Sequence, residues 1–378
     1  MLWLAWKMLV GNRVKYLGIV FGVVFAALLI AQQASIFCGL MSFTVSQILD
    51  IAGPGIWVMD AGVQYVDDVK PLADTELFRV KSVPGVAWAV RLYKGIARAR
   101  LQEGMYEQMI LLGLDDATLV GAPRQLLAGS VADLRRPDAV IIDDAGYRKL
   151  WPDEPFRLGR TFEMNDRRAV LVGVTKARRT FTSFPIVYTR YSQAVLFAPP
   201  ERKVLSFVLA EPAADVTADE ACDRIQERTG LLAVTPSRFL WKTVGYYLRK
   251  TGMPLNFGIT VLLGFLVGTA IAGQTFYLFT VENIRQYGAL KAMGAGNGTI
   301  LAMVLFQGLQ VGLVGFGVGV GLAALFGWWV KGASRLAFFM PWEVLAVTAL
   351  AVFLIVLIAS LVSVRKVLVV EPAIVFRG

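Results

Sequence analysis

Four long apolar segments divide the chain, and each is long enough to cross a lipid bilayer. A transmembrane helix needs about 20 consecutive, mostly apolar residues. The segments at residues 16–38, 254–279, 299–330 and 342–364 meet that length, and none has a charged residue in its core. The pattern predicts a membrane α-helical protein with four transmembrane helices, one before and three after a long polar insertion.

Most charged residues lie in that insertion. Residues 50–250 hold 28 of the 38 Lys and Arg residues and 25 of the 28 Asp and Glu residues, which leaves 10 basic and 3 acidic residues elsewhere. Excess Lys and Arg mark the cytoplasmic ends of membrane helices. The basic residues that flank the apolar segments are Lys7, Arg13, Lys15, Arg285, Lys291, Arg365, Lys366 and Arg377.

These flanks predict cytoplasmic N- and C-termini and an extracytoplasmic insertion, in a multi-pass membrane protein. The topology also explains the net charge of +10, so we expect no nucleic-acid partner. The predicted order is an amphipathic interfacial helix (1–15), transmembrane helix 1 with a stalk (16–49), an extracytoplasmic α+β domain (50–236), a stalk with transmembrane helix 2 (237–281), a cytoplasmic helix and turn (282–298), transmembrane helix 3 (299–330), a short outer loop (331–341), transmembrane helix 4 (342–364) and a cytoplasmic tail (365–378).

Short apolar runs between turn residues predict the α+β fold of the insertion. Asn165 and Asp166 suit the turn of a hairpin, and Thr217 with Glu220 has the spacing of a helix capping box. Residues 237–249 predict an amphipathic helix that runs into the second span. The expected strands are 55–60, 86–101, 107–114, 139–143, 160–163, 168–174, 204–209 and 232–235, and the expected helices are 74–80, 144–150 and 217–229.

The stretch from residue 282 to 298 is the most informative part of the sequence. A short polar helix there lies between two membrane spans, so it is placed at the membrane face, where it can touch a cytoplasmic partner. A glycine-rich reversal into the third span follows it. The residues that we assign to this contact are Glu282, Arg285, Tyr287, Gly288, Leu290, Lys291, Met293 and Gly294.

Glycines at four-residue spacing recur in the apolar segments. Small residues at this spacing let helices approach closely in lipid, which predicts a tightly packed and dimerising bundle. General glycine enrichment in membrane helices is the alternative explanation. The residues assigned to helix packing and dimerisation are Gly264, Gly268, Gly308, Gly312, Gly315 and Gly319.

The sequence offers little for catalysis. The chain has no histidine, which removes a Ser–His–Asp site and the commonest metal ligand, and it has no phosphate-binding loop for ATP. The adjacent carboxylates Asp67/Asp68 and Asp143/Asp144 are better explained by turns and loop solvation. We therefore expect a chain that is not an enzyme and that binds no metal or cofactor directly.

Three motifs resemble the FtsX/MacB/LolC superfamily of ABC transporter permeases. Glu282, Arg285, Gly288, Leu290, Lys291, Ala292 and Gly294 occupy the pattern that follows the second span in that family. The step Glu371–Pro372–Ala373 is similar to the family's tail, and RTFEMNDRRAVLVGV with FPIVYTRYSQAVLF resembles its extracytoplasmic domain. The segment around the polar helix is especially similar to the DevC-like permease subgroup.

The resemblance implies a permease subunit of the bacterial inner membrane that couples ATP hydrolysis in a partner to motion of its extracytoplasmic domain, which would lie in the periplasm. Two ABC ATPase subunits, which would bind ATP and Mg²⁺, would dock with a pair of permease chains on the polar helix, and we expect Tyr287, Leu290 and Met293 to contact the ATPase. DevC-like relatives imply a tripartite efflux system for a lipid-like or other hydrophobic substrate, with a periplasmic adaptor and an outer-membrane channel. A lipoprotein-release or cell-wall-hydrolase-regulating permease, and a membrane-anchored ligand receptor that signals, are the alternatives.

Overall fold

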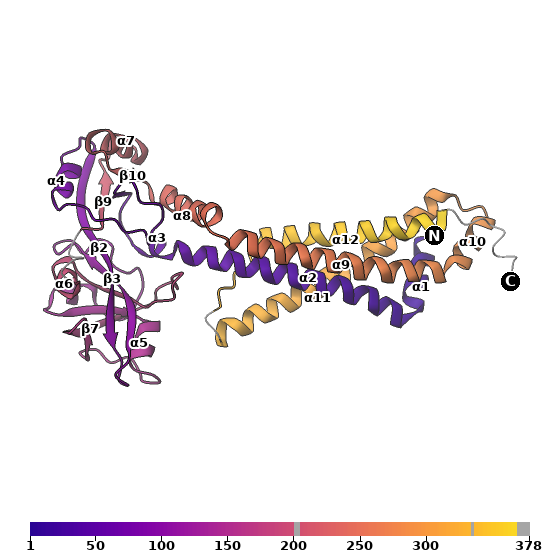
Figure 1. Ribbon diagram of the computed structural model, residues 1–378, viewed down its shortest axis with the longest axis horizontal. Coiled ribbons are helices and arrows are strands. Elements are labelled where there is room, and N and C mark those ends of the chain that lie inside the picture. Colours follow the sequence, from indigo (N-terminus) through magenta and orange to yellow (C-terminus); the bar gives the residue numbers. More distant parts are fainter. Residues whose placement is uncertain (200–204, 334–335, 369–378) are drawn as a thin grey trace. The chain divides into compact units, whose positions relative to one another are not determined.

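The computed structural model describes residues 1–199, 205–333 and 336–368. The chain forms two compact units (Figure 1). The first unit combines Met1–Leu40 with Gly252–Gly378, and the second is Met41–Thr251. The first unit is called the bundle below, and the second the outer domain.

Four helices of the bundle are long and apolar enough to cross a membrane. They are α2 (Arg13–Thr44), α9 (Met253–Glu282), α11 (Asn297–Ala333) and α12 (Trp342–Leu368), with mean hydropathies of 2.3, 2.0, 2.0 and 3.0 in their most apolar windows. α11 continues past the predicted end at residue 330, and α12 continues past residue 364. The tail motif Glu371–Pro372–Ala373, Arg377 and Arg335 lie outside the described residues, as does the side chain of Lys331.

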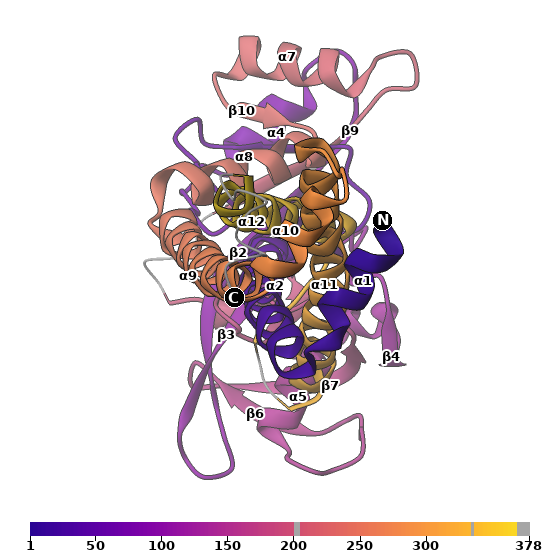
Figure 2. The same ribbon diagram turned by 90° about the vertical axis from the view of Figure 1, so that its right-hand side faces the viewer.

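Side chains from all four helices meet in one apolar core. Ile19 and Val23 of α2, Phe276 of α9, Val304 of α11 and Ile355 of α12 are at most 2% exposed and belong to the same cluster. Figure 2 looks along the bundle, where the four long helices gather with α1 (Leu2–Gly11) and α10 (Ile284–Ala292) beside them. The outward faces remain apolar, as a surface in contact with lipid requires.

The outer domain is built on a ten-stranded mixed sheet in the order β10-β1-β9-β2-β3-β8-β5-β7-β4, with β6 paired to β2 and β7. β3 and β8 run parallel, as do β5 and β7. The strands are β1 (Ile56–Met59), β2 (Val86–Arg100), β3 (Tyr106–Leu114), β4 (Leu126–Gly129), β5 (Ala139–Asp143), β6 (Thr161–Met164), β7 (Arg167–Thr175), β8 (Ile186–Arg190), β9 (Phe207–Pro212) and β10 (Leu232–Val234).

The sheet is buried on both faces. Ile56 and Val58 of β1 join one apolar cluster, while Trp57 and Met59 join the other, because successive side chains of a strand point to opposite faces. Continuous apolar strands such as this one are typical of doubly covered sheets. The helices are α3 (Ser46–Asp50), α4 (Thr75–Lys81), α5 (Asp144–Leu150), α6 (Tyr191–Phe197), α7 (Ala218–Thr229) and α8 (Pro236–Lys250), with a 3₁₀ turn at Val131–Arg135.

Several local predictions for this domain are confirmed. Asn165 and Asp166 have φ of 48° and 60°, as a tight hairpin turn requires, and they join β6 to β7. The Thr217 side chain accepts the Glu220 backbone N–H and the Glu220 carboxylate accepts the Thr217 N–H, which completes the capping box. β9, however, begins at Phe207 rather than at residue 204, which lies outside the described residues.

The expectation that the helix at residues 237–249 runs into the second span is wrong. α8 ends at Lys250, and Thr251 has an extended backbone with φ −115° and ψ 156°. α9 begins only after Gly252, with Pro254 in its first turn, where a proline does not disturb the helix. Thr251 and Gly252 therefore separate α8 from α9, and the two do not form one continuous helix.

Candidate functional site

The polar segment between the second and third spans folds as a separate short helix. α9 ends at Glu282, and Asn283 separates it from α10 while its side-chain amide donates to the Phe279 carbonyl oxygen at 2.8 Å. Gly294 has φ +96°, a left-handed conformation that glycine adopts without strain. The Ala295 N–H then donates to the Leu290 carbonyl at 2.9 Å, which closes the C-terminal end of the helix. The glycine therefore produces the reversal that the sequence predicts.

The inner face of α10 is held by a buried polar link. The Tyr287 hydroxyl donates to Oε1 of Gln307 in α11 at 3.0 Å, and Nε2 of Gln307 donates to the Ala5 carbonyl oxygen in α1 at 2.9 Å. Tyr287 and Gln307 are fully buried. Burial raises the pKa of Tyr287 to about 12, so the hydroxyl keeps its proton and remains a donor. We call this contact the Tyr287–Gln307–Ala5 link.

Two further contacts tie this region to the other long helices. Lys15 at the start of α2 forms an ion pair with Glu282 at the end of α9. The Lys291 ammonium donates to the Val367 carbonyl oxygen near the end of α12 at 3.1 Å. A lysine that meets the last carbonyls of a helix satisfies acceptors that have no partner within the helix. α10 is thus connected directly or through one neighbour to every long helix of the bundle.

The structure divides the residues that we assigned to partner contact into two groups. Tyr287, Gly288 and Leu290 are buried, and Leu290 packs with Ala5 and Met303. This burial does not fit the expected contact of Tyr287 and Leu290 with an ATPase groove, because their side chains are already covered by the chain itself. Lys291 is half-buried, and the exposed residues are Glu282, Arg285, Met293 and Gly294.

The surface that remains for a partner is small and mixed in character. Arg285 and Gln286 are exposed on one turn of α10, and Met293 is 75% exposed at its end. Neither charge nor spacing in the sequence showed which apolar residues of the helix face inward. The signal that was available was Gln307, an isolated amide in an apolar span, because a polar group in lipid needs a partner.

All six glycines assigned to helix packing contact another helix of the same chain. A methyl carbon added at Gly315 would lie 2.5 Å from Cγ1 of Val23, and one at Gly319 would lie 2.6 Å from Cβ of Ala27. These two glycines therefore let α2 approach α11. The corresponding neighbours of the others are Leu29 at Gly264, Ala26 at Gly268, Ser360 at Gly308 and Val356 at Gly312.

The adjacent carboxylates of the outer domain have structural partners. Asp143 caps α5 by accepting the Gly146 N–H at 3.0 Å, and it also accepts the Ile186 N–H at 3.2 Å. Asp67 pairs with Lys94 of β2. Over residues 1–199, 205–333 and 336–368, no group of three His, Cys, Asp or Glu side chains gathers as metal ligands would.

Comparison with known proteins assigns both units to recognised families. Residues 16–228 match the family model of the MacB-like periplasmic core domain, which is more than half of the chain. Residues 258–372 match the FtsX-like permease C-terminal family. Two uncharacterized ABC transporter permeases, from two strains of Mycobacterium tuberculosis, are each 24% identical over 337 residues, which covers 87% of this chain and 86% of the relative.

Two solved structures are also similar. The extracellular domain of the noncanonic ABC-type transporter YknZ from Gram-positive bacteria has 14% identity and a TM-score of 0.36, over 48% of this chain and 100% of that one. The periplasmic region of MacB from Actinobacillus actinomycetemcomitans has 14% identity and a TM-score of 0.37, over 54% of this chain and 99% of that one. On the family matches, the chain belongs to the ABC transporter permeases of the FtsX/MacB type.

Proposed function

We propose that this permease is the transmembrane subunit of a mechanotransmission-type ABC exporter. A separate ATPase subunit docks on α10, and its nucleotide-driven motion passes through the bundle to the periplasmic domain. Family membership implies an ATPase partner, a membrane setting and a transporter subunit that is not itself the catalyst. ATP and Mg²⁺ would then be bound by the partner.

The observation that carries this proposal is the connection of α10 to its neighbours. The Tyr287–Gln307–Ala5 link joins α10 to α11 and α1, and Lys291 joins it to α12. A partner that pushes on the exposed residues of α10 would displace several helices together, because packed interiors transmit strain. A loop that served only as a connector would need none of these contacts.

The assembly that we propose contains two permease chains and two ATPases in the bacterial inner membrane. The termini and α10 face the cytoplasm, and the outer domain faces the periplasm. A periplasmic adaptor and an outer-membrane channel would complete a tripartite efflux system for a lipid-like or other hydrophobic substrate. The packing glycines act within one chain, so a second copy would contact other surfaces of the bundle.

Docking can be tested by purifying the chain with its candidate ATPase. Met293→Glu places a charge on the exposed end of α10 and leaves the buried link intact. We expect complex formation and ATPase stimulation to fall about tenfold or more, as for loss of an apolar anchor in an interface. Met105→Glu is the matched control, because Met105 is 58% exposed in the outer domain and receives the same substitution.

Transmission is tested separately by Tyr287→Phe, which removes the hydroxyl and keeps the ring. This variant should still bind the ATPase, while the motion of the periplasmic domain on ATP hydrolysis should be reduced, as read from a pair of spin labels placed there. If Met293→Glu binds and stimulates the ATPase as the unmodified chain does, α10 is not the docking surface. If Tyr287→Phe retains full motion, the buried link does not transmit it.

A further inference from the structure

The outer domain contains a cavity of about 570 Å³ beside the middle of β2. The cavity lies where β2 exchanges neighbours: Leu92 is the last residue paired with β9, and Tyr93 is the first paired with β3. Cavities of roughly 300–1,000 Å³ hold small ligands in proteins. This one is therefore large enough for a small molecule, and every residue that lines it belongs to the outer domain.

Most of the cavity wall is apolar. Val69 and Pro71 contribute from the segment before α4, Ile96 and Ile110 from β2 and β3, and Phe184 from the segment before β8. Ile96 is 42% exposed. A wall of this composition favours an alkyl or ring system over a fully hydrated ion.

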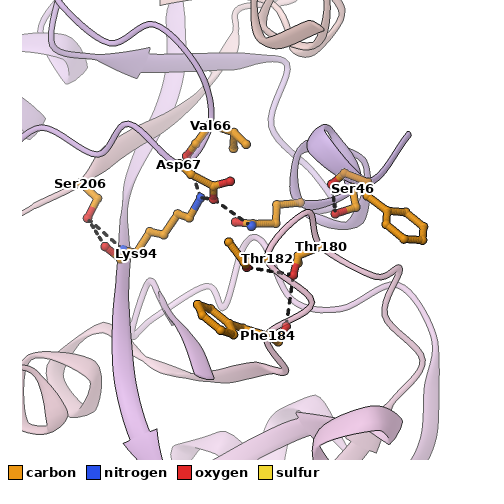
Figure 3. Close-up of polar contacts among 10 residues, drawn as sticks. Ser46, Val66, Asp67, Lys94, Thr180, Thr182, Phe184 and Ser206 are labelled. Carbon is orange, nitrogen blue, oxygen red and sulfur yellow. Dashed lines mark hydrogen bonds and ion pairs between the residues drawn. The ribbon is translucent and has the colours of Figure 1, made fainter. Parts of the chain in front are cut away.

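A buried ammonium group lies at the polar end. The side chain of Lys94 is 7% exposed, and its Nζ donates to the Val66 carbonyl at 2.6 Å and to Oδ1 of Asp67 at 2.5 Å. Figure 3 shows the Lys94 side chain extending from its strand to Asp67, with Thr182 and Phe184 on a neighbouring segment. Burial lowers the pKa of Lys94, and the Asp67 carboxylate opposes that effect. A buried ammonium of this kind requires an anion at its side.

The two partners of this ion pair are not held equally. Lys94 lies in a central strand opposite Leu112, and its backbone N–H donates to the Ser206 hydroxyl at 2.9 Å while its carbonyl accepts from that hydroxyl at 3.1 Å. Asp67 lies in the segment between β1 and α4, and its side chain is 25% exposed. Of the two charged groups, the Asp67 carboxylate is therefore the one that can move into water when another anion replaces it beside Lys94.

We propose that this cavity binds an amphiphile with a single carboxylate group, which replaces Asp67 beside Lys94 while the apolar part lies against Val69, Pro71, Ile110 and Phe184. A monocarboxylate preserves the charge balance of the pair. A cationic amphiphile would face the Lys94 ammonium without compensation. A neutral amphiphile offers Lys94 no anion and gains only from the apolar wall. The site does not depend on ATPase docking.

Displacement of the Asp67 side chain by the ligand would change the contacts between the segment around Asp67 and its neighbouring helices. Asp67 also accepts from Nε2 of Gln47 in α3 at 3.1 Å, so the exchange would release α3 from this contact. Tyr65, two residues earlier, stacks on Tyr246 of α8 with ring centroids 4.3 Å apart. Ligand binding in the cavity would therefore change contacts of α3 and α8, the helices that lie next to the membrane-spanning helices α2 and α9 in the sequence.

The probe for the test is octanoate, with 1-octanol and octyltrimethylammonium as alkyl-matched neutral and cationic controls. The full chain is held in lipid nanodiscs, and the signal of empty discs is subtracted. Calorimetry should show octanoate binding at least tenfold tighter than 1-octanol, as roughly expected for one charge-assisted contact. Hydrogen–deuterium exchange of residues 60–72 should accelerate with octanoate alone. Equal binding of octanol overturns the role of the carboxylate.

Two variants separate the site from the membrane. Lys94→Met removes the ammonium, and Thr182→Trp fills the cavity from an exposed position while keeping the ion pair. Both should abolish octanoate binding, whereas Gln108→Trp, at an exposed position of β3 outside the lining, should retain it. Unchanged binding in Thr182→Trp overturns the site even if Lys94→Met fails to fold. No ATPase is present, so failure here leaves the docking proposal intact.

Discussion

The bundle and the outer domain each bury a polar contact between distant parts of the chain, but the two contacts differ in kind. In the bundle, Tyr287, Gln307 and the Ala5 carbonyl form neutral hydrogen bonds. In the outer domain, Lys94 and Asp67 form an ion pair. A neutral hydrogen bond can break and re-form at a cost of about 1 kcal/mol. A buried ion pair can only exchange one ion for another, because the isolated charge is too costly.

The difference suits two tasks. In the exporter proposed above, the bundle would move with each cycle of ATP hydrolysis, and contacts that break without leaving an unpaired charge in lipid would suit that motion. A ligand cavity benefits from a charge that stays in place and selects what replaces its partner. Four substitutions test this difference between the two units.

The largest effect is expected from Asp143, a buried carboxyl group that caps α5. Burial raises its pKa to about 7, above the ordinary aspartate value of 3.8. Its contribution to stability is therefore complete below about pH 4 and lost as the pH rises through 7. Asp143→Asn keeps an acceptor without the charge, so the outer domain should gain on the order of 2–4 kcal/mol at pH 8 and little at pH 4.

Urea unfolding at both pH values, followed by hydrogen exchange in β5 and β8, measures this effect. A gain confined to pH 8 would show that the ionised Asp143 carboxylate, which has no cation beside it in the part of the chain that the structure describes, destabilises the outer domain. A native domain that is equally stable at pH 4 and pH 8 would contradict the assignment.

The second effect is expected from Asp67→Ala, which leaves the Lys94 ammonium buried with the Val66 carbonyl as its partner among the described residues. The outer domain should lose about 3 kcal/mol, the low end for breaking a buried pair. Asp138→Asn is the control, because the Arg168 side chain of that pair is 67% exposed and loss of an exposed pair costs less than about 1 kcal/mol. Equal losses in the two variants would mean that burial of Lys94 has no energetic consequence.

The third effect concerns packing in the bundle. Gly315→Ala adds a carbon 2.5 Å from Val23, which forces α2 and α11 apart and should cost about 1–3 kcal/mol. Gly317→Ala, two residues later in α11, meets open space and should be neutral. Thermal unfolding of the two variants in the same mild detergent gives the difference directly. A neutral Gly315→Ala would show that the bundle is looser than its contacts indicate.

The smallest effect on stability is expected from the neutral link. Tyr287→Phe should cost about 1 kcal/mol, because a hydrogen bond is lost and Oε1 of Gln307 is left without its donor. Combining it with Gln307→Leu should restore part of that loss, which a double-mutant cycle measures. A loss as large as that of Asp67→Ala would remove the distinction between the two units.

The sequence predicted best those features that depend on neighbouring residues. The four spans follow from runs of apolar residues, and the Asn165–Asp166 turn and the Thr217 cap follow from local chemistry. β8 was recognised only within a family motif, because its parallel partner β3 is more than 70 residues away in the sequence. No local signal identifies that pairing.

The candidate site was predicted in position but not in orientation. The short helix and its glycine turn follow from composition, yet Tyr287 is buried because Gln307, twenty residues later, offers it an acceptor. Lys94 likewise looked like one charged residue among many in the outer domain. Lys94 is buried beside Asp67 at the edge of the cavity, and these parts come together only when the sheet folds.

The Tyr287–Gln307–Ala5 link ends on a peptide carbonyl, and so does the contact of Lys291 with Val367. A main-chain acceptor is present whatever residue occupies the position, so no point substitution at residue 5 or 367 can delete the acceptor itself. Substitutions at those positions can weaken the contacts only through a change in side-chain size or in helix propensity. Only substitutions of Tyr287, Gln307 or Lys291, whose side chains make these hydrogen bonds, can remove the contacts directly.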